Sequence, residues 1–175
     1  MTERMDCFTI RAGVFSWGRL FGKFPVLKRL YNGYQQRRLK KYLLPQHGIG
    51  NSVFTDDYAG VYRDHHYRKY KTYTTTQVIK IGAATLWIKI NNALIIGDIS
   101  VLAGDFDSMI HKLKKLTRKL GIKEIQFHSS PNTTLHTLFA KQFNANPSFP
   151  VIFKDLEGGA RLNKIKFTSA DIDTF

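Results

Sequence analysis

The sequence predicts one α/β domain with a mixed, largely antiparallel central sheet flanked by helices. Three observations predict this fold class. The chain has 175 residues, 43% of them apolar and 13% aromatic, which is enough for one domain with a hydrophobic core. Residues 77–175 alternate strand-like and helix-like patterns in the order β-β-α-β-α-β-β. Residues 1–76 are instead basic and mainly helical in pattern.

The basic N-terminal part is expected to hold two helices. Residues 1–12 before them are expected to be a leader or a short first strand, and their only strand-like run is 7–10. Residues 14–22 are rich in aromatic side chains and predict a short helix. Pro25 suits the first turn of a second helix, which carries its cations opposite its apolar side chains.

Aromatic and basic residues alternate toward the end of this part. All eight tyrosines lie between Tyr31 and Tyr73, and five of them fall in residues 58–73. Rings interleaved with cations can stack on a nucleic-acid strand and neutralise it. The alternative is a helix and turn that bury rings and leave charges in solvent, which we favour because no recognised RNA-binding motif accompanies the pattern.

The second part begins with strand-like runs. Residues 77–81 and 84–90 look like the two arms of a hairpin around Gly82. Asn92 lies in a turn signal, and residues 93–101 form an almost continuously apolar run, typical of a buried central strand.

A basic amphipathic helix is expected next. Its apolar stripe would face the sheet, Asp105 or Asp107 suits its N-cap, and Gly121 closes it. A strand at 122–128 should follow, and then a helix that opens at Asn132 or Thr133.

The last two runs, 150–156 and 162–167, are expected to close the sheet as an antiparallel pair.

The formal net charge is +14, from 27 Lys and Arg against 13 Asp and Glu. Residues 1–75 hold 14 basic and 5 acidic side chains, and residues 76–175 hold 13 and 8, so the first part is the more basic. Such charge favours polyanions: nucleic acid, anionic lipid or the phosphates of a cofactor. A basic surface without a cognate polyanion is the alternative.

Other functional classes find little support. The longest apolar runs are too short to span a membrane, and the charged start is unlike a secretory signal. Cys7 is the only cysteine, so we expect no internal disulfide and no cysteine-based metal site. We therefore expect a cytoplasmic protein with no integral membrane segment.

The order of elements after two basic helices resembles the GNAT superfamily of acyl-CoA N-acyltransferases. The local resemblance lies in Ala93-Leu-Ile-Ile-Gly-Asp-Ile-Ser100, in the helix ending Lys119-Leu-Gly121, in strand 122–128 and in Asn132-x-x-Leu-x-x-Leu-Phe139-x-Lys-x-Phe143. Residues 167–175 also resemble the C-termini of divergent bacterial GNAT-like proteins. The resemblance covers residues 77–175 by motif and residues 1–76 only by plan.

This resemblance implies acetyl-CoA as the cofactor and acetyl transfer to an amine by direct attack on the thioester. Asp98 would be the general base and would take the proton from the amine directly or through a water. The cofactor would be bound by Ile99, Ser100, Val101, Gly104, Ser108, Lys112 and Asn132. A structural Asp98, hydrogen-bonded to backbone at a strand bulge beside Gly97, is the alternative.

The chain departs from the family at its phosphate loop and at its general acid. The family's loop reads Arg/Gln-x-x-Gly-x-Gly/Ala, whereas residues 101–108 here contain one glycine, no arginine and two carboxylates. Those carboxylates would repel an anion. The family's tyrosine aligns with Phe139, which has no proton to donate, and the glycine of its Gly-Phe pair aligns with Gln142.

The remaining polar candidates are weighed against structural roles. His65 and His66 beside Asp64 suit a solvated turn better than a metal site, because no third ligand is suitably spaced. His128 suits a strand end. Asp171 and Asp173 suit a solvated tail.

Three functional hypotheses follow. The leading one is an acyl-CoA N-acyltransferase. The second is a GNAT-like binding module without chemistry, with nucleic acid or another protein as its partner. The third is peripheral membrane attachment through the aromatic and basic side chains of residues 11–24, although core packing of those rings is favoured because Gly18, Gly22 and Pro25 interrupt the helix.

Overall fold

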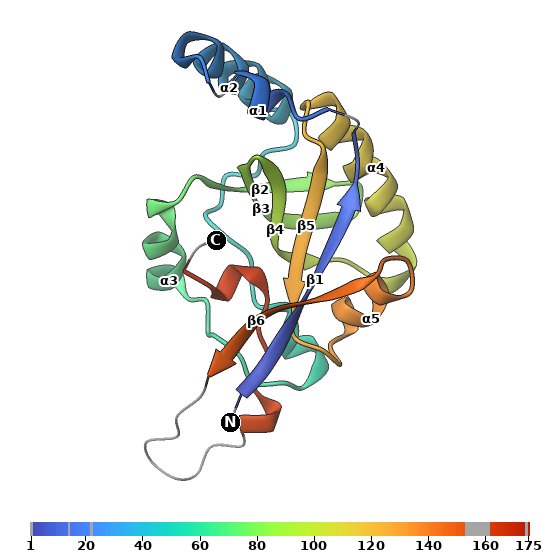
Figure 1. Ribbon diagram of the computed structural model, residues 1–175. Coiled ribbons are helices and arrows are strands. Elements are labelled where there is room, and N and C mark those ends of the chain that lie inside the picture. Colours follow the sequence, from blue (N-terminus) through green and yellow to red (C-terminus); the bar gives the residue numbers. More distant parts are fainter. Residues whose placement is uncertain (1, 14, 22, 153–161, 174) are drawn as a thin grey trace.

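The computed structural model describes residues 2–13, 15–21, 23–152, 162–173 and 175. Within these residues six strands form one sheet in the order β2-β3-β4-β5-β1-β6. The sheet is mixed and mostly antiparallel, and helices lie against it (Figure 1). The fold class predicted from the sequence is therefore confirmed.

Three strands precede the long helix and pair as antiparallel neighbours: β2 (Thr76–Ile81), β3 (Ala84–Asn91) and β4 (Ala93–Ser100). Gly82 at φ 64° and Asn92 at φ 56° occupy the left-handed region that such tight turns require. The residue patterns predicted all three of these strands, although the predicted order β-β-α-β-α-β-β has only two strands before its first helix.

The only parallel pair among the described strands joins β4 to β5 (Glu124–Ser129). The connection between them is α4 (Phe106–Lys119), because parallel neighbours need a long crossover. The helix ends as predicted at Gly121, whose φ of 68° a side chain would strain.

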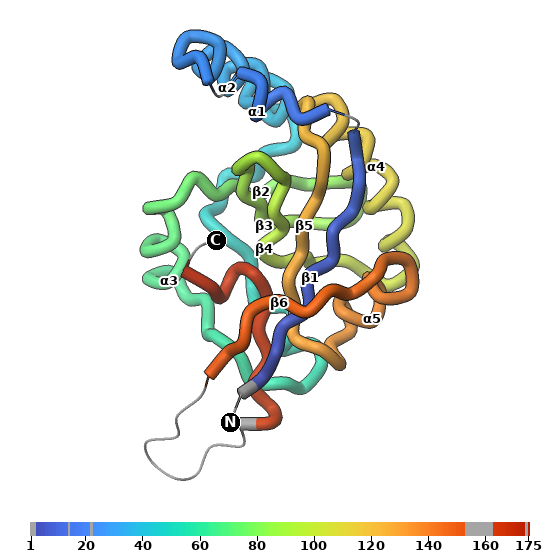
Figure 2. Tube along the Cα trace, viewed as in Figure 1, coloured from blue at the N-terminus to red at the C-terminus, as the bar shows by residue number. Residues whose placement is uncertain are grey.

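The N-terminal strand β1 (Thr2–Arg11) lies between β5 and β6 (Ala145–Ile152), antiparallel to both. Figure 2 shows the blue strand β1 beside the amber β5 and the orange-red β6. It places Met5, Phe8 and Ile10 in the core.

The predicted closing pair is wrong, because β1 takes the place that 162–167 was expected to fill. Residues 162–164 form a single 3-10 turn, η4 (Leu162–Lys164). Of the run 150–156, residues 153–156 lie outside the described residues. The strand beside β6 needs apolar side chains on its core face, and β1 supplies them.

One face of the sheet packs against α4 and α5 (Thr134–Ala140). On this face, alternate residues of the strands pack against the apolar stripe of α4, and α5 adds Leu135 and Phe139. The buried stripe of α4 consists of Phe106, Met109, Ile110, Leu113 and Leu116.

The opposite face is covered by α3 (His65–Tyr70) and by the end of the chain, including the turn η5 (Ser169–Asp171). A second, smaller apolar cluster forms here from Ile49, Val78, Trp87, Ala170 and Phe175. The sheet is therefore the middle layer of three.

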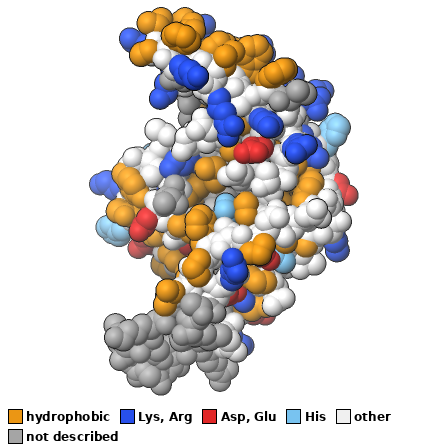
Figure 3. Space-filling view, in the orientation of Figure 1, with side chains coloured by type: hydrophobic (Ala, Val, Ile, Leu, Met, Phe, Trp, Pro, Cys, Tyr) orange, Lys and Arg blue, Asp and Glu red, His pale blue; other side chains and the backbone are white. Residues whose placement is uncertain are grey.

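Helices α1 (Trp17–Phe21) and α2 (Pro25–Leu39) project from one end of the sheet (Figure 1). The favoured core packing of the aromatic rings around α1 is wrong, because α1 has no buried residue. Orange and blue side chains gather over this end in Figure 3. Among the described residues, no helix is long and apolar enough to cross a bilayer.

Candidate functional site

The parallel strands β4 and β5 separate toward their carboxyl ends. They pair only where residues 94–96 face residues 125–127. In α/β sheets, ligands bind outside the carboxyl ends of such strands, where the chain changes direction. Asp98 and the three residues after it lie at this opening, so the sequence and the topology point to the same place.

A bulge in β4 decides which face of the sheet receives Asp98. The register of β4 against β3 shifts at Gly97, which is an extra residue. Ile96 and Ile99 therefore both reach the core under α4, while Asp98 faces the other side. Strict alternation would have placed this carboxylate beside Ile96 in the apolar core.

Asp98 is fully buried, and both of its carboxylate oxygens are engaged. Arg63 Nη1 lies 2.5 Å from Oδ2, which also accepts from the backbone N–H of Ser52 at 3.0 Å. Oδ1 accepts from the N–H of Ile99 at 2.7 Å. The geometry matches a structural carboxylate at a bulge, and Asp98 has no exposed oxygen with which to reach an amine.

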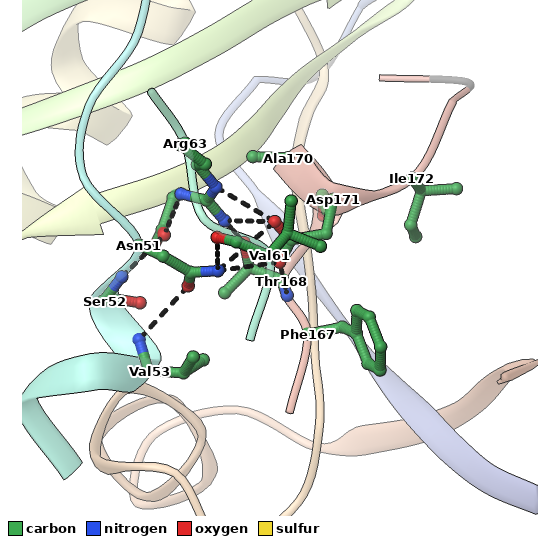
Figure 4. Close-up of polar contacts among 12 residues, drawn as sticks. Asn51, Ser52, Val53, Val61, Arg63, Phe167, Thr168, Ala170, Asp171 and Ile172 are labelled. Atoms are coloured by element: carbon green, nitrogen blue, oxygen red, sulfur yellow. Dashed lines mark hydrogen bonds and ion pairs between the residues drawn. The ribbon is translucent and has the colours of Figure 1, made fainter. Parts of the chain in front are cut away.

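Arg63 joins Asp98 to a second buried carboxylate, Asp171. Its Nε and Nη2 both lie 2.9 Å from Asp171 Oδ1, and Nη2 donates to Thr168 Oγ1 at 2.8 Å. Asp171 Oδ2 accepts from the N–H of Thr168 at 2.9 Å. Figure 4 shows Arg63 and Asp171 facing each other, with Asn51 beside them. We call Arg63, Asp98 and Asp171 the Arg63 cluster.

The charges of the Arg63 cluster do not balance, because one guanidinium faces two carboxylates. Burial, only partly offset by Arg63, raises the pKa of the Asp171 carboxyl. For Arg63 burial acts to lower the pKa, but the two carboxylates outweigh it and raise the pKa. A proton on Asp171 would therefore relieve the excess negative charge.

The opening between β4 and β5 is occupied by the protein's own C-terminal residues. Thr168 bridges Ser129 at the end of β5, and the backbone N–H of His128 donates to Ser169 Oγ at 3.0 Å. The N–H of Ser130 donates to the carbonyl of Phe167 at 2.9 Å. Residues 167–169 thus provide hydrogen-bond partners at the end of β5, where β4 has diverged and no longer pairs with it.

Phe175 completes this closure on the β4 side. Its side chain is 2% exposed and meets Trp87 edge-to-face, with 5.5 Å between ring centroids. The ring also lies on Gly97, where any Cβ atom would overlap it. Gly97 therefore forms the bulge and also leaves the space in which the ring of Phe175 packs.

The basic and aromatic segment around α3 holds the C-terminal residues in place. Three of its side chains donate to backbone carbonyls: Tyr67 to residue 170 at 2.9 Å, Lys71 to residue 172 at 2.6 Å and Tyr73 to residue 173 at 2.5 Å. Tyr62 and Tyr70 remain exposed. The favoured interpretation, buried rings with charges in solvent, is therefore wrong in its detail: Lys71 is 1% exposed, whereas Tyr73 is 57% exposed.

A cavity of about 400 Å³ remains at the carboxyl end of β4. Three predicted cofactor-binding residues line it together: Ile99, Ser100 and Val101. Asp56 reaches its rim and accepts from the N–H of Thr134 at 2.7 Å, so a carboxylate already occupies the start of α5.

The other four predicted cofactor-binding residues do not line this cavity. Gly104, Ser108 and Lys112 are exposed along α4 and the turn before it, and Lys112 Nζ approaches Gly82 in the β2–β3 turn. Asn132 has a φ of 66°, and its carbonyl accepts from Tyr58 Oη at 3.2 Å. The structure thus brings three of the seven together.

The phosphate-loop segment has an acidic turn in place of a glycine-rich loop. It contains η3 (Ala103–Asp105), followed directly by α4. Asp105 occupies the N-cap of α4 but makes no capping hydrogen bond, and Asp107 accepts instead from Gln142. The predicted side-chain cap is therefore not formed, while both carboxylates stay at the positive end of the helix.

Phe139 is fully buried among the rings of Phe8, Phe106 and Phe127. A tyrosine hydroxyl in this all-aromatic setting would need a polar partner, which explains the phenylalanine physically.

The histidines are dispersed. His65 and His66 are exposed at the start of α3, where Asp64 caps the helix. His128 is half-buried, its Nδ1 lies 2.7 Å from Ser148 Oγ, and burial lowers its pKa. The described residues contain no group of three potential metal ligands.

Sequence reasoning missed Arg63 and Phe175 and misjudged Asp171. Asp173 is exposed as expected, but Asp171 is buried in the Arg63 cluster and not in a solvated tail. A single arginine and a terminal phenylalanine leave no periodic signal. The one clue was Asp98 itself, because a carboxylate within an apolar strand needs a cationic or backbone partner.

Comparison with known proteins identifies no relative. The protein-family models, the curated proteins and the solved structures each gave no match to this chain. The GNAT resemblance therefore remains a prediction based on the motifs and the order of elements.

Proposed function

We propose that this chain is a GNAT-like binding module that recognises an anionic partner and does not transfer acyl groups. The single observation that carries this proposal is the closure of the opening between β4 and β5. Phe175 and the Arg63 cluster occupy the place where a substrate would have to meet Asp98. With its oxygens bound by Arg63 and backbone N–H groups, Asp98 is held as a structural acceptor.

The anionic partner is suggested by the charge distribution. The net charge is +14, and the N-terminal part is the more basic. By contrast, the acidic turn before α4 disfavours a cofactor phosphate at the carboxyl end of β4. Favourable anion contacts are therefore expected away from the opening, on the basic surface.

The test combines two titrations of the purified protein. We expect heparin, a generic polyanion, to bind with an affinity that falls steeply and linearly on a log–log plot against salt. We expect acetyl-CoA to give no heat at millimolar concentration. Micromolar binding of acetyl-CoA that is lost in Ser100→Trp, a change that fills the cavity beside β4, would contradict the proposal.

Acyl-CoA N-acyltransferase remains a second candidate, favoured by one specific observation. The cavity of about 400 Å³ at the carboxyl end of β4 is lined by Ile99, Ser100 and Val101, the residues that the resemblance assigns to the cofactor. Catalysis there would require the C-terminal residues to withdraw. Phe175→Ala should then strengthen acetyl-CoA binding, whereas a binding module gains none.

A further inference from the structure

The hairpin formed by α1 and α2 exposes a large apolar surface. We define the hairpin as residues 15–21 and 23–39. Phe15 is 73% exposed, Val26 72% and Leu30 66%, and Leu20 and Phe24 are each 58% exposed. Within α2 only Gln35 and Leu39 are buried. Exposed apolar patches of this kind mark interaction surfaces.

The charged side chains of the hairpin and of the chain on either side of it have one sign. Residues 7–55 contain nine Lys and Arg and no Asp or Glu. Three of the cations, Arg19, Lys23 and Lys28, line a cleft of about 640 Å³ beside the hairpin, and none of the described residues that line it is a carboxylate. A second copy of this chain would bring the same charge to the same face, so the complement must be anionic.

An apolar groove lies along the same hairpin. It has a volume of about 650 Å³ and is lined chiefly by Trp17, Phe21, Leu27, Leu30 and Tyr34. Trp, Tyr and Phe next to Lys and Arg are the side chains that populate the headgroup region of bilayers. A nucleic-acid duplex would meet the cations but would leave the aliphatic side chains in water.

The hairpin is fixed to the body of the protein by polar contacts. Tyr31 Oη donates to the carbonyl of Leu120 at 2.7 Å, Gln35 Nε2 donates to the same oxygen at 3.0 Å, and Tyr34 Oη donates to the carbonyl of Lys119 at 2.9 Å. These carbonyls end α4 and have no partner within the helix. The apolar surface is therefore held in place before any ligand arrives, which lowers the cost of ordering on binding.

We propose that the α1–α2 hairpin docks on an anionic lipid bilayer. Leu20 and Phe24 enter the boundary between headgroups and acyl chains, while Arg19, Lys23 and Lys28 contact lipid phosphates. A cytoplasmic protein, as expected from the sequence, would meet the anionic inner leaflet. This inference rests on the anionic partner of the proposed function and names its chemical class.

The test is co-sedimentation with vesicles of phosphatidylcholine alone and of phosphatidylcholine mixed equally with phosphatidylserine. We expect binding to the anionic vesicles only. Leu20→Gln/Phe24→Gln should weaken it about tenfold or more, because two apolar side chains no longer leave water on binding. Arg19→Glu/Lys23→Glu should weaken it at least as much. Matched controls are Leu102→Gln, at a site 76% exposed, and Lys115→Glu on α4, which should bind like the parent.

Tryptophan fluorescence locates the contact. Trp17 is 46% exposed and Trp87 is fully buried, so only Trp17 should shift to shorter wavelength on the vesicles. The shift should be absent in Trp17→Phe. If Leu20→Gln/Phe24→Gln binds anionic vesicles as tightly as the parent, or if only duplex DNA binds, the lipid inference is wrong while the anionic partner stands. If neither vesicles, DNA nor heparin bind, both are wrong.

Discussion

The ring of Phe175 lies on Gly97, so this side chain packs against the bulge of a central strand. A methyl group at position 97 would overlap that ring. We expect Gly97→Ala to cost about 1–3 kcal/mol of the free energy of unfolding through overpacking, and Phe175→Ala about 3 kcal/mol through loss of a buried ring. In Phe175→Ala, the added methyl should cost much less.

Urea unfolding of the two single variants and the double variant measures this coupling. Gly104→Ala is the matched control, because a Cβ there meets open space. Strictly additive losses for Gly97 and Phe175 would mean that the ring does not rest on the glycine.

Arg63 should be more important to stability than either carboxylate that it binds. Arg63→Met leaves two buried carboxylates without a cation, which we expect to cost about 3–5 kcal/mol in urea unfolding at neutral pH. Adding Asp98→Asn and Asp171→Asn to that variant should restore most of the loss. A cost below about 1 kcal/mol for Arg63→Met alone would show that water reaches the cluster.

Asp171 should make stability depend on pH in a defined direction. Its folded pKa is raised above 3.8, so the native state binds the proton more tightly than the unfolded chain. Its stabilising contribution is therefore fully present below pH 3.8 and is lost as the pH rises through the folded pKa.

The measurement is the difference in free energy of unfolding between the parent and Asp171→Asn across this window. The parent should lose stability relative to the variant as the pH rises. A constant difference, or a parent that gains, would contradict the raised pKa.

Tyr31 should hold the α1–α2 hairpin at every pH at which the folded protein is studied. Burial raises its pKa to about 12, so the phenol stays protonated and donates to the carbonyl of Leu120. Tyr31→Phe should cost about 1 kcal/mol and speed amide exchange in α2. Tyr62→Phe, at a ring 77% exposed, is the control and should change neither.

The elements that local patterns predicted are those whose neighbours are close in sequence. β2, β3 and β4 form consecutive hairpins, and α4 follows directly with its apolar stripe facing them. Periodicity and turn residues specify such elements, and here they located them to within a few residues.

The rest depends on contacts between distant residues, which leave no periodic trace. Arg63 reaches Asp171 across most of the chain, and only the folded backbone brings them together. In the same way, the apolar residues around α1 were predicted to be buried, because a sequence shows that side chains are apolar but not whether other residues cover them. The sequence singled out Asp98, but it could not name Arg63 as the partner of that carboxylate.

The central position of β1 has a consequence for how the protein is made. Asp6 pairs with Ser129 on one side and with Pro147 on the other, so both neighbours of this strand are synthesised more than a hundred residues after it. Until then a growing chain carries a strand with two unsatisfied edges. Such long-range pairing slows folding and favours association with other chains. We therefore expect the N-terminal strand to be the segment that molecular chaperones must shield during synthesis.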